Sequence, residues 1–141
     1  MPAARTILAF DFGLRRIGVA VGQDVTASAS PLGTIANRES GVDHDAIATL
    51  VREWRPSALV VGMPAHADGS PTDLLEPIEA FIAELERYKL PVHTIDERYT
   101  SIEAERVLKD ARASGQRRRI TKSSIDAAAA VFIAERYLAS R

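Results

Sequence analysis

The sequence predicts one α/β domain over residues 1–141, in which a mixed β-sheet carries helices on its faces. Two early hairpin-like strand pairs and a later alternation of strands with helices support this class, because a purely parallel sheet would not begin with hairpins. The length of 141 residues supports a single domain, since it is near the usual domain size and can bury a core without a disulfide or metal staple.

Each expected element follows from a local pattern. Apolar β-rich runs predict strands, and Gly13 lies in the turn between the first two. Apolar residues at helical spacing predict helices, with Pro56 ending the first of them. Thr100-Ser101-Ile102-Glu103 matches a capping box that would open another helix. The expected strands are 6–11, 17–21, 32–36, 58–61 and 91–95, and the expected helices are 42–54, 72–88, 100–114 and a last one from about 123.

Composition excludes several classes of protein. The chain has no cysteine, which rules out disulfides, thiolate metal sites and a cysteine nucleophile. Its longest uninterrupted apolar run, residues 127–134, is far shorter than the ~20 residues of a membrane span. Asp11 interrupts the only apolar stretch near the N-terminus, so no signal peptide is expected. These features predict a soluble, cytoplasmic protein without a membrane partner.

Charge is distributed unevenly along the chain. The net charge is −1, but residues 105–122 hold seven basic and two acidic side chains. That segment is strongly positive and the remainder is mildly negative. A single basic segment of this kind is typical of a protein that binds a polyanion at one site.

Acidic residues stand where apolar elements end or begin. Asp11 ends the first strand, Asp96 and Glu97 follow the strand at 91–95, and Asp126 lies near the start of the last helix. Carboxylates that meet at one sheet edge bind hard divalent cations through oxygen. Two such ions about 3.5–4 Å apart are the apparatus for in-line attack on a phosphodiester.

Each of these acids also has an ordinary structural explanation. Asp11 would cap the turn around Gly13, and Asp96 or Glu97 would be a solvated loop acid. Asp126 would complement the dipole at the start of its helix. The histidines have no metal-ligand spacing and are expected to be structural or superficial: His44, His66 and His93.

Four segments together resemble one protein family. They are Phe10-Asp11-Phe12-Gly13-Leu14-Arg15-Arg16-Ile17-Gly18-Val19-Ala20, Val60-Val61-Gly62-Met63-Pro64, Asp96-Glu97-Arg98-Tyr99-Thr100-Ser101 and Ile125-Asp126-Ala127-Ala128-Ala129. In this order they resemble the YqgF/RuvX family of Holliday-junction-resolvase-like proteins, assigned as pre-16S rRNA nucleases. The match spans nearly the whole chain, and its small departures, at Met63 and at residues 122–124, change none of the acids.

The resemblance implies an RNase H-like fold with a mixed five-stranded sheet of order 3-2-1-4-5 and helices on both faces. It also implies a nuclease that uses Mg²⁺ or Mn²⁺, with two ions, to mature the 5′ end of 16S rRNA. Carried over by motif, the catalytic and metal-binding acids are Asp11, Glu97 and Asp126. In that strand order Glu97 starts about 10 Å from Asp11, because one strand lies between. Asp68, which follows the intervening strand, is therefore an alternative ligand.

The expected partner is RNA, namely pre-16S rRNA and ribosomal particles, with DNA as an alternative, and the chain is a monomer or a homodimer. Three other functions compete with rRNA processing. A DNA junction resolvase would share the fold and acids, and a non-catalytic RNA-binding or transcription factor would keep the fold alone. An actin-like ATPase needs a second lobe, for which 141 residues are too few. The expected nucleic-acid contacts are Arg15, Arg16, Arg98, Arg117, Arg118 and Arg119.

Overall fold

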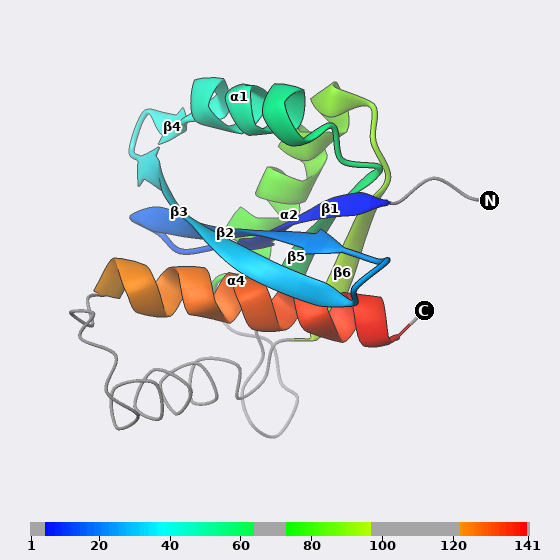
Figure 1. Ribbon diagram of the computed structural model, residues 1–141. Helices are drawn as coiled ribbons and strands as arrows, with labels where there is room; N and C mark the ends of the chain where they lie inside the picture. The colour runs from blue at the N-terminus through cyan, green and yellow to red at the C-terminus, as the bar shows by residue number, and fades with distance from the viewer. Residues whose placement is uncertain (1–4, 64–72, 97–121, 141) are drawn as a thin grey trace.

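A computed structural model of the chain describes residues 5–63, 73–96 and 122–140, which form a twisted sheet covered by helices (Figure 1). In chain order the elements are β1 (Thr6–Asp11), β2 (Arg16–Gln23), β3 (Ser28–Arg38), β4 (Gly41–Val42), α1 (His44–Trp54), β5 (Ala58–Met63), α2 (Leu75–Leu85), the 3₁₀ turn η1 (Glu86–Tyr88), β6 (Val92–Asp96) and α4 (Lys122–Ala139). The helix expected at 100–114 lies outside the described residues.

The sheet is mixed and has the strand order β4-β3-β2-β1-β5-β6. β1 pairs antiparallel with β2 and parallel with β5, and β5 pairs parallel with β6. The expected order of five strands is therefore confirmed. A sixth strand, β4, pairs only Asn37 with Val42 and Arg38 with Gly41. Two residues carry too little alternation for a sequence pattern to mark them as a strand.

β3 begins earlier than the expected strand at 32–36, because Pro31 does not end it. Ala20 pairs with Pro31 and Val19 pairs with Gly33, so Leu32 is an extra residue at a shift in the register. Such a bulge leaves part of the hydrogen-bond ladder open, and proline, which has no N–H, is tolerated there.

The helices begin and end close to their expected positions. The Asp43 side chain accepts a hydrogen bond from the Ala46 N–H at 3.1 Å and caps α1. Arg55 then takes a left-handed conformation, and Pro56 prevents the helix from continuing. α2 is shorter than the expected helix at 72–88 and passes into η1.

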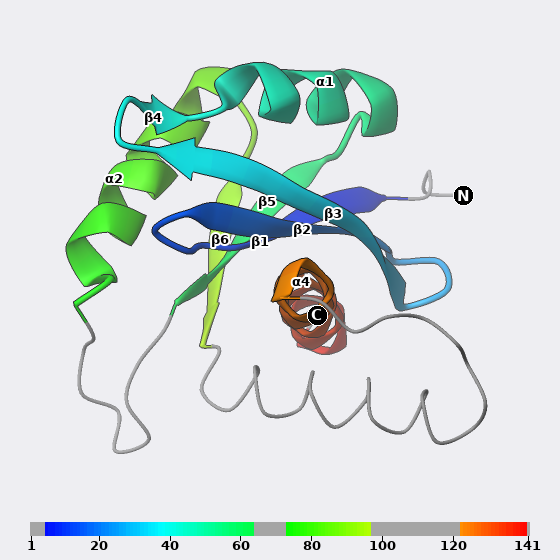
Figure 2. The same ribbon diagram turned by 90° about the vertical axis from the view of Figure 1, so that its left-hand side faces the viewer.

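Helices cover both faces of the sheet, as expected: α1 and α2 lie on one face and α4 on the other (Figure 2). Alternate residues of β1 serve the two cores. Leu8 and Phe10 join the cluster under α1 and α2, whereas Ile7 and Ala9 join the cluster under α4. Within the part of the chain that is described, no helix is long and apolar enough to cross a membrane.

Candidate functional site

Three parallel strands, β1, β5 and β6, end at the same edge of the sheet (Figure 2). Phe10 lies opposite Val61, and Val61 lies opposite Thr94. Asp11 and Asp96, the last residues of β1 and β6, are therefore both at this edge. The sequence predicted one strand between them, and β5 occupies that place. Ligands often bind beyond the carboxyl ends of parallel strands, so this edge is the candidate site.

The two aspartates belong to opposite faces of the sheet. Asp11 continues the series of Ile7 and Ala9, which faces α4, and its side chain is half-buried. On β6, His93 faces α4, because its ring centroid lies 5.2 Å from that of Tyr137. Asp96, three residues further along the alternating strand, thus belongs to the other face and is exposed. Only Asp11 of this pair lies on the face that carries α4.

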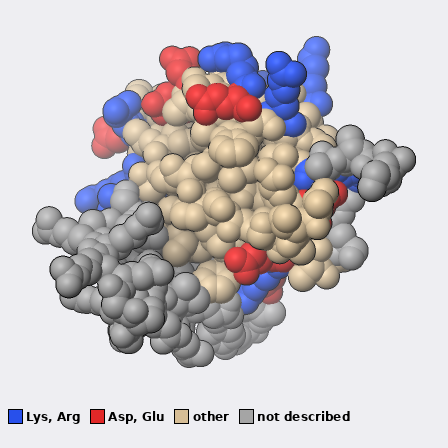
Figure 3. Space-filling model, in the orientation of Figure 1, with Lys and Arg blue, Asp and Glu red and all other residues tan. Residues whose placement is uncertain are grey.

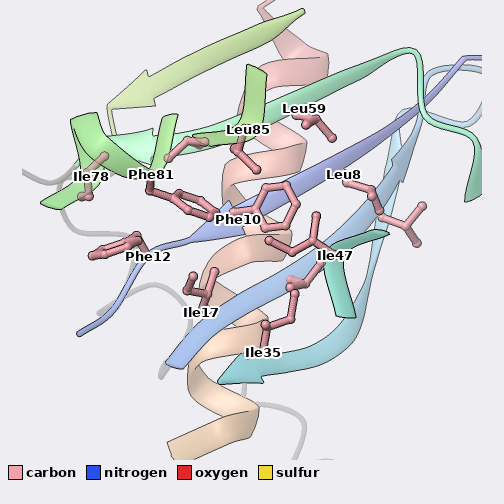
Figure 4. Packing of buried hydrophobic residues seen from close by; sticks show 13 residues of the cluster. Leu8, Phe10, Phe12, Ile17, Ile35, Ile47, Leu59, Ile78, Phe81 and Leu85 are labelled. Atoms are coloured by element: carbon pink, nitrogen blue, oxygen red, sulfur yellow. The ribbon is translucent and has the colours of Figure 1, made fainter. Parts of the chain in front are cut away.

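The residues before and after Asp11 in the sequence, Phe10 and Phe12, are aromatic and are buried in the core. The ring of Phe10 meets that of Phe81 edge to face with centroids 5.7 Å apart, and Phe12 lies 5.4 Å from the same ring. Figure 4 shows the three rings converging from β1, the turn after it and α2. Because both neighbours of Asp11 are buried on one face, the backbone at Asp11 is fixed with its side chain toward the other.

The turn after Asp11 is tight, and β3 holds it. A Cβ atom at Gly13 would lie 2.5 Å from the main-chain oxygen of Arg16, so only glycine fits. Asn37 donates from Nδ2 to the Gly13 oxygen at 2.7 Å and from its backbone N–H to the Arg15 oxygen at 2.9 Å. In this turn Arg15 is exposed and Arg16 is half-buried.

Asp126 lies in α4, which begins on the side of the sheet where β1 ends (Figure 1). Its helix position is four residues before Ala130 and seven before Ile133, both fully buried. Asp126 thus stands at helical spacing from two residues that pack against the sheet. The helix starts at Lys122, and its first turn holds no acidic residue. Asp126 therefore lies beyond the first turn, where the helix dipole fades, so the expected dipole explanation fits it poorly.

Several predicted site residues lie outside the described part of the chain, so their placement stays a prediction. They are Asp68, Glu97, Arg98, Arg117, Arg118 and Arg119. Among residues 5–63, 73–96 and 122–140, no three metal-binding side chains come together. Of the three acids carried over by motif, only Asp11 has a described side chain.

His44 has a structural role, as expected. Its Nδ1 lies 3.0 Å from the Tyr88 hydroxyl, and its Nε2 lies 3.2 Å from a Glu84 carboxylate oxygen. These contacts join the start of α1 to the end of α2 and to η1. Burial raises the pKa of the Tyr88 hydroxyl, and the nearby carboxylates of Asp45 and Glu84 add to this while Arg87 opposes it.

No sequence pattern marked Asn37 as part of the site. Its hydrogen-bond partner Gly13 is 24 residues away, and the contact depends on how β3 is registered against β2. A polar residue near the end of a predicted strand is too common to single out. The hydrogen bonds by which Asn37 holds the turn therefore depend on the fold and follow from no local sequence pattern.

Comparisons of structure identify the fold. A Thermus thermophilus RuvC bound to a Holliday junction superposes with a TM-score of 0.61 at 15% identity, covering 97% of this chain and 95% of that one. A fowlpox virus resolvase bound to Holliday junction DNA gives 0.59 at 10% identity, covering 96% and 97%. The fold is thus the RNase H-like fold of these resolvases, as expected.

Comparisons of sequence identify the family. A protein of Paraburkholderia phymatum named "Putative pre-16S rRNA nuclease" is 45% identical over 134 residues, covering 94% of this chain and 84% of that protein. One of the same name from Azotobacter vinelandii is 42% identical and covers 100% of this chain and 98% of its own. The family model described as "RuvX: Holliday junction resolvase" matches residues 5–140, and the chain belongs to the RuvX family.

Proposed function

We propose that this RuvX protein is a divalent-metal-dependent nuclease that hydrolyses phosphodiester bonds and processes the 5′ end of pre-16S rRNA in the cytoplasm. The observation that carries the proposal is the position of Asp11. It ends the central strand β1 at the edge where β5 and β6 also end, on the sheet face that α4 covers. The names of the relatives support the reaction and the RNA substrate.

The proposed metal ligands are Asp11, Glu97 and Asp126. Asp11 and the helix α4, which contains Asp126, lie on the same side of the sheet. Glu97 comes directly after β6, whose alternation assigns Ile95 to the α4 face and Asp96 to the other. Because Asp96 belongs to the face away from α4, Asp96 is the less suitable ligand, and we propose Glu97 instead.

Carboxylate oxygens are the donors that Mg²⁺ and Mn²⁺ prefer, so this set of acids fits the metal that the family implies. We propose two ions, which when bound would activate water and stabilise the charge that develops on the phosphate. The chain itself fixes the ligands: the buried rings of Phe10 and Phe12 hold the backbone of Asp11, and α4 is packed against the sheet through Ala130 and Ile133.

The described part of the chain also supports a phosphate contact beside Asp11. Arg15 is exposed in the turn that follows this residue, and Arg16 begins β2 next to it. By contrast, residues 28–37 of β3 carry no charge, and Figure 3 shows a largely uncharged surface over that strand. Arginine forms paired hydrogen bonds to phosphate oxygens that give affinity without sequence preference. We propose that Arg98 and Arg117–Arg119 extend this contact.

The test is cleavage of matched substrates by the purified protein. A labelled precursor with the 5′ extension of 16S rRNA, a single-stranded DNA and a four-way DNA junction are incubated with Mg²⁺ or Mn²⁺. We expect metal-dependent cleavage of the RNA, lost in EDTA. Asp11→Asn, Glu97→Gln and Asp126→Asn should each reduce cleavage by several orders of magnitude, while circular dichroism and melting remain those of a folded protein.

Full activity in EDTA, or in the Asp11→Asn variant, would refute the mechanism. Asp68→Asn serves as the matched control for Glu97→Gln. If the Asp68 variant is inactive and the Glu97 variant is active, then Asp68 is the ligand. Whichever of Asp68 and Glu97 proves to be the ligand, the role of Asp11 is tested separately by the Asp11→Asn variant.

The second candidate function is resolution of DNA junctions, which the family description and the likeness to junction-bound RuvC favour. It predicts symmetric cuts in the four-way junction and little cleavage of the RNA. The same acids would serve both substrates, so the acid variants do not distinguish the two functions. The comparison of RNA cleavage with junction cleavage does.

A further inference from the structure

An apolar side chain stands exposed in the turn between β1 and β2. Leu14 is 65% exposed, whereas Phe12, two residues before it, is 7% exposed and packs on Phe81. The turn therefore buries one apolar residue and displays the next. A single exposed leucine is common on protein surfaces, so its meaning depends on where it stands and how it is held.

The backbone on both sides of Leu14 is held by one residue of β3. Asn37 bonds the main-chain oxygens of Gly13 and Arg15, the two neighbours of Leu14, at 2.7 and 2.9 Å. The turn is also compact, because the Gly13 α-carbon approaches the Arg16 oxygen so closely that no side chain fits. Leu14 is thus displayed on a fixed backbone, which lowers the entropy lost when it makes a contact.

Leu14 is also close to the acid on which the proposed function depends. It is three residues from Asp11, so its backbone lies within about 10 Å of that residue even if fully extended. At about 3.4 Å per nucleotide of a stacked strand, that distance corresponds to at most about three nucleotides. The next residue, Arg15, is exposed and suited to a phosphate.

We infer that Leu14 is a substrate-contacting residue that packs on the face of an unpaired base next to the phosphate that is cleaved beside Asp11. The inference rests on the proposed nuclease function and narrows its substrate to a strand that is unpaired at the cleaved position. In a duplex the faces of the bases are covered by their neighbours, whereas an unpaired base exposes its face to an apolar side chain.

The chain provides a matched control in Val25. It is an aliphatic residue that is 72% exposed, in the turn between β2 and β3. Because β2 is antiparallel to β1, this turn lies at the opposite end of the sheet from Asp11. Val25→Ala removes apolar surface of similar exposure without touching the candidate site.

The experiment measures binding in the Asp11→Asn background, which keeps the substrate intact. The probes are a fluorescent single-stranded RNA, the blunt duplex of the same sequence, and the single strand with one abasic nucleotide at successive positions. Leu14→Ala should raise the Kd for the single strand roughly 5- to 10-fold, the loss expected when a partly covered leucine loses its outer carbons. The slope of affinity against salt should stay unchanged, because no charge is removed.

Val25→Ala should leave the Kd unchanged, and Leu14→Met should restore most of the affinity. At one abasic position the difference between the Leu14→Ala protein and its parent should disappear, since the base that Leu14 contacts is then missing. Leu14 is mostly exposed, so the melting temperature of Leu14→Ala should equal that of its parent, which separates a lost contact from misfolding.

Equal Kd values for the Leu14→Ala protein and its parent would overturn the inference, as would an equal loss on the duplex. A loss seen only with ribosomal particles, and not with naked RNA, would also overturn it and assign Leu14 to a protein contact. Failure of the parent protein to bind any RNA, together with no cleavage by the wild type, would instead count against the proposed function.

Discussion

Gly13→Ala tests whether the tight turn after Asp11 supports the candidate site. The added Cβ would lie 2.5 Å from the Arg16 main-chain oxygen, and Cβ atoms in real structures essentially never come closer than 3.0 Å to another atom. A main-chain oxygen cannot rotate away as a side-chain end would. The turn must therefore open by about half an ångström against the hydrogen bonds from Asn37.

The size of the effect follows from two opposing contributions. Forcing an extra carbon into a close-packed place costs roughly 1–3 kcal/mol. Replacing glycine by alanine also restricts the unfolded chain, which offsets about 0.4–1 kcal/mol of that cost. The net loss in the free energy of unfolding should be about 1–2 kcal/mol. For a domain of this size that lowers the melting temperature by roughly 3–8 °C.

The assay is thermal unfolding together with cleavage of the RNA precursor at a temperature well below both transitions. Cleavage should fall more than stability predicts, because Asp11 and Arg15 flank the displaced backbone. Gly22→Ala is the control: its Cβ meets Ile7 side-chain atoms at 3.1 Å and Leu138 Cδ1 at 3.2 Å, and these can shift. Gly22 pairs with Ile7, away from Asp11, so its variant should keep wild-type cleavage. A Gly13→Ala protein with wild-type melting and cleavage would refute this account of the turn.

Three further outcomes are expected. Millimolar Mg²⁺ or Mn²⁺ should raise the melting temperature by mass action, whereas NaCl of equal ionic strength should do less, and an equal shift from NaCl would argue against a metal site. Replacing Arg117, Arg118 and Arg119 together by alanine should flatten the salt slope of single-strand binding by roughly one to two units, and an unchanged slope would mean that they do not touch phosphate. The pKa of Tyr88 is raised above its ordinary value of 10.0, so its neutral form stabilises the fold below that pH and this contribution is lost as the pH rises through the higher folded-state pKa. Wild type should therefore lose stability above pH 10 more steeply than Tyr88→Phe, and parallel curves would contradict this.

The regular parts of the fold were predictable because local chemistry determines them. β1 occupies the expected residues, since its buried apolar run stops at a charged residue. β3 was predicted too short, because Pro31 normally ends a strand and only the bulge opposite Val19 and Ala20 makes it acceptable. That irregularity depends on pairing with β2, which no local pattern contains.

The candidate site shows the same division. Asp11 was predictable as a site residue, because a carboxylate at the end of a buried strand is locally unfavourable and therefore indicates a functional role. The support from Asn37 was not, since it joins residues that only the strand register brings together. The same holds for the face assignments that separate Asp11 from Asp96, which follow from contacts with α4 and Tyr137.

Gly62, the residue of β5 at the candidate edge, affects whether acids on the two sides of β5 are able to bind the same metal ion. The strands that carry them are about 10 Å apart, because β5 lies between. Gly62 lies opposite Ile95, and the register of β1 with β5, continued by one residue, sets Asp11 opposite Gly62. Gly62 is buried and follows Val60 on the α4 face, so β5 contributes no side chain at this position. Without a side chain here, the space between the ends of β1 and β6 on this face stays open, and carboxylates from both sides would be able to hold one ion. A larger residue at this position would occupy that space, so Gly62 supports the proposal that acids from both sides of β5 share a metal ion.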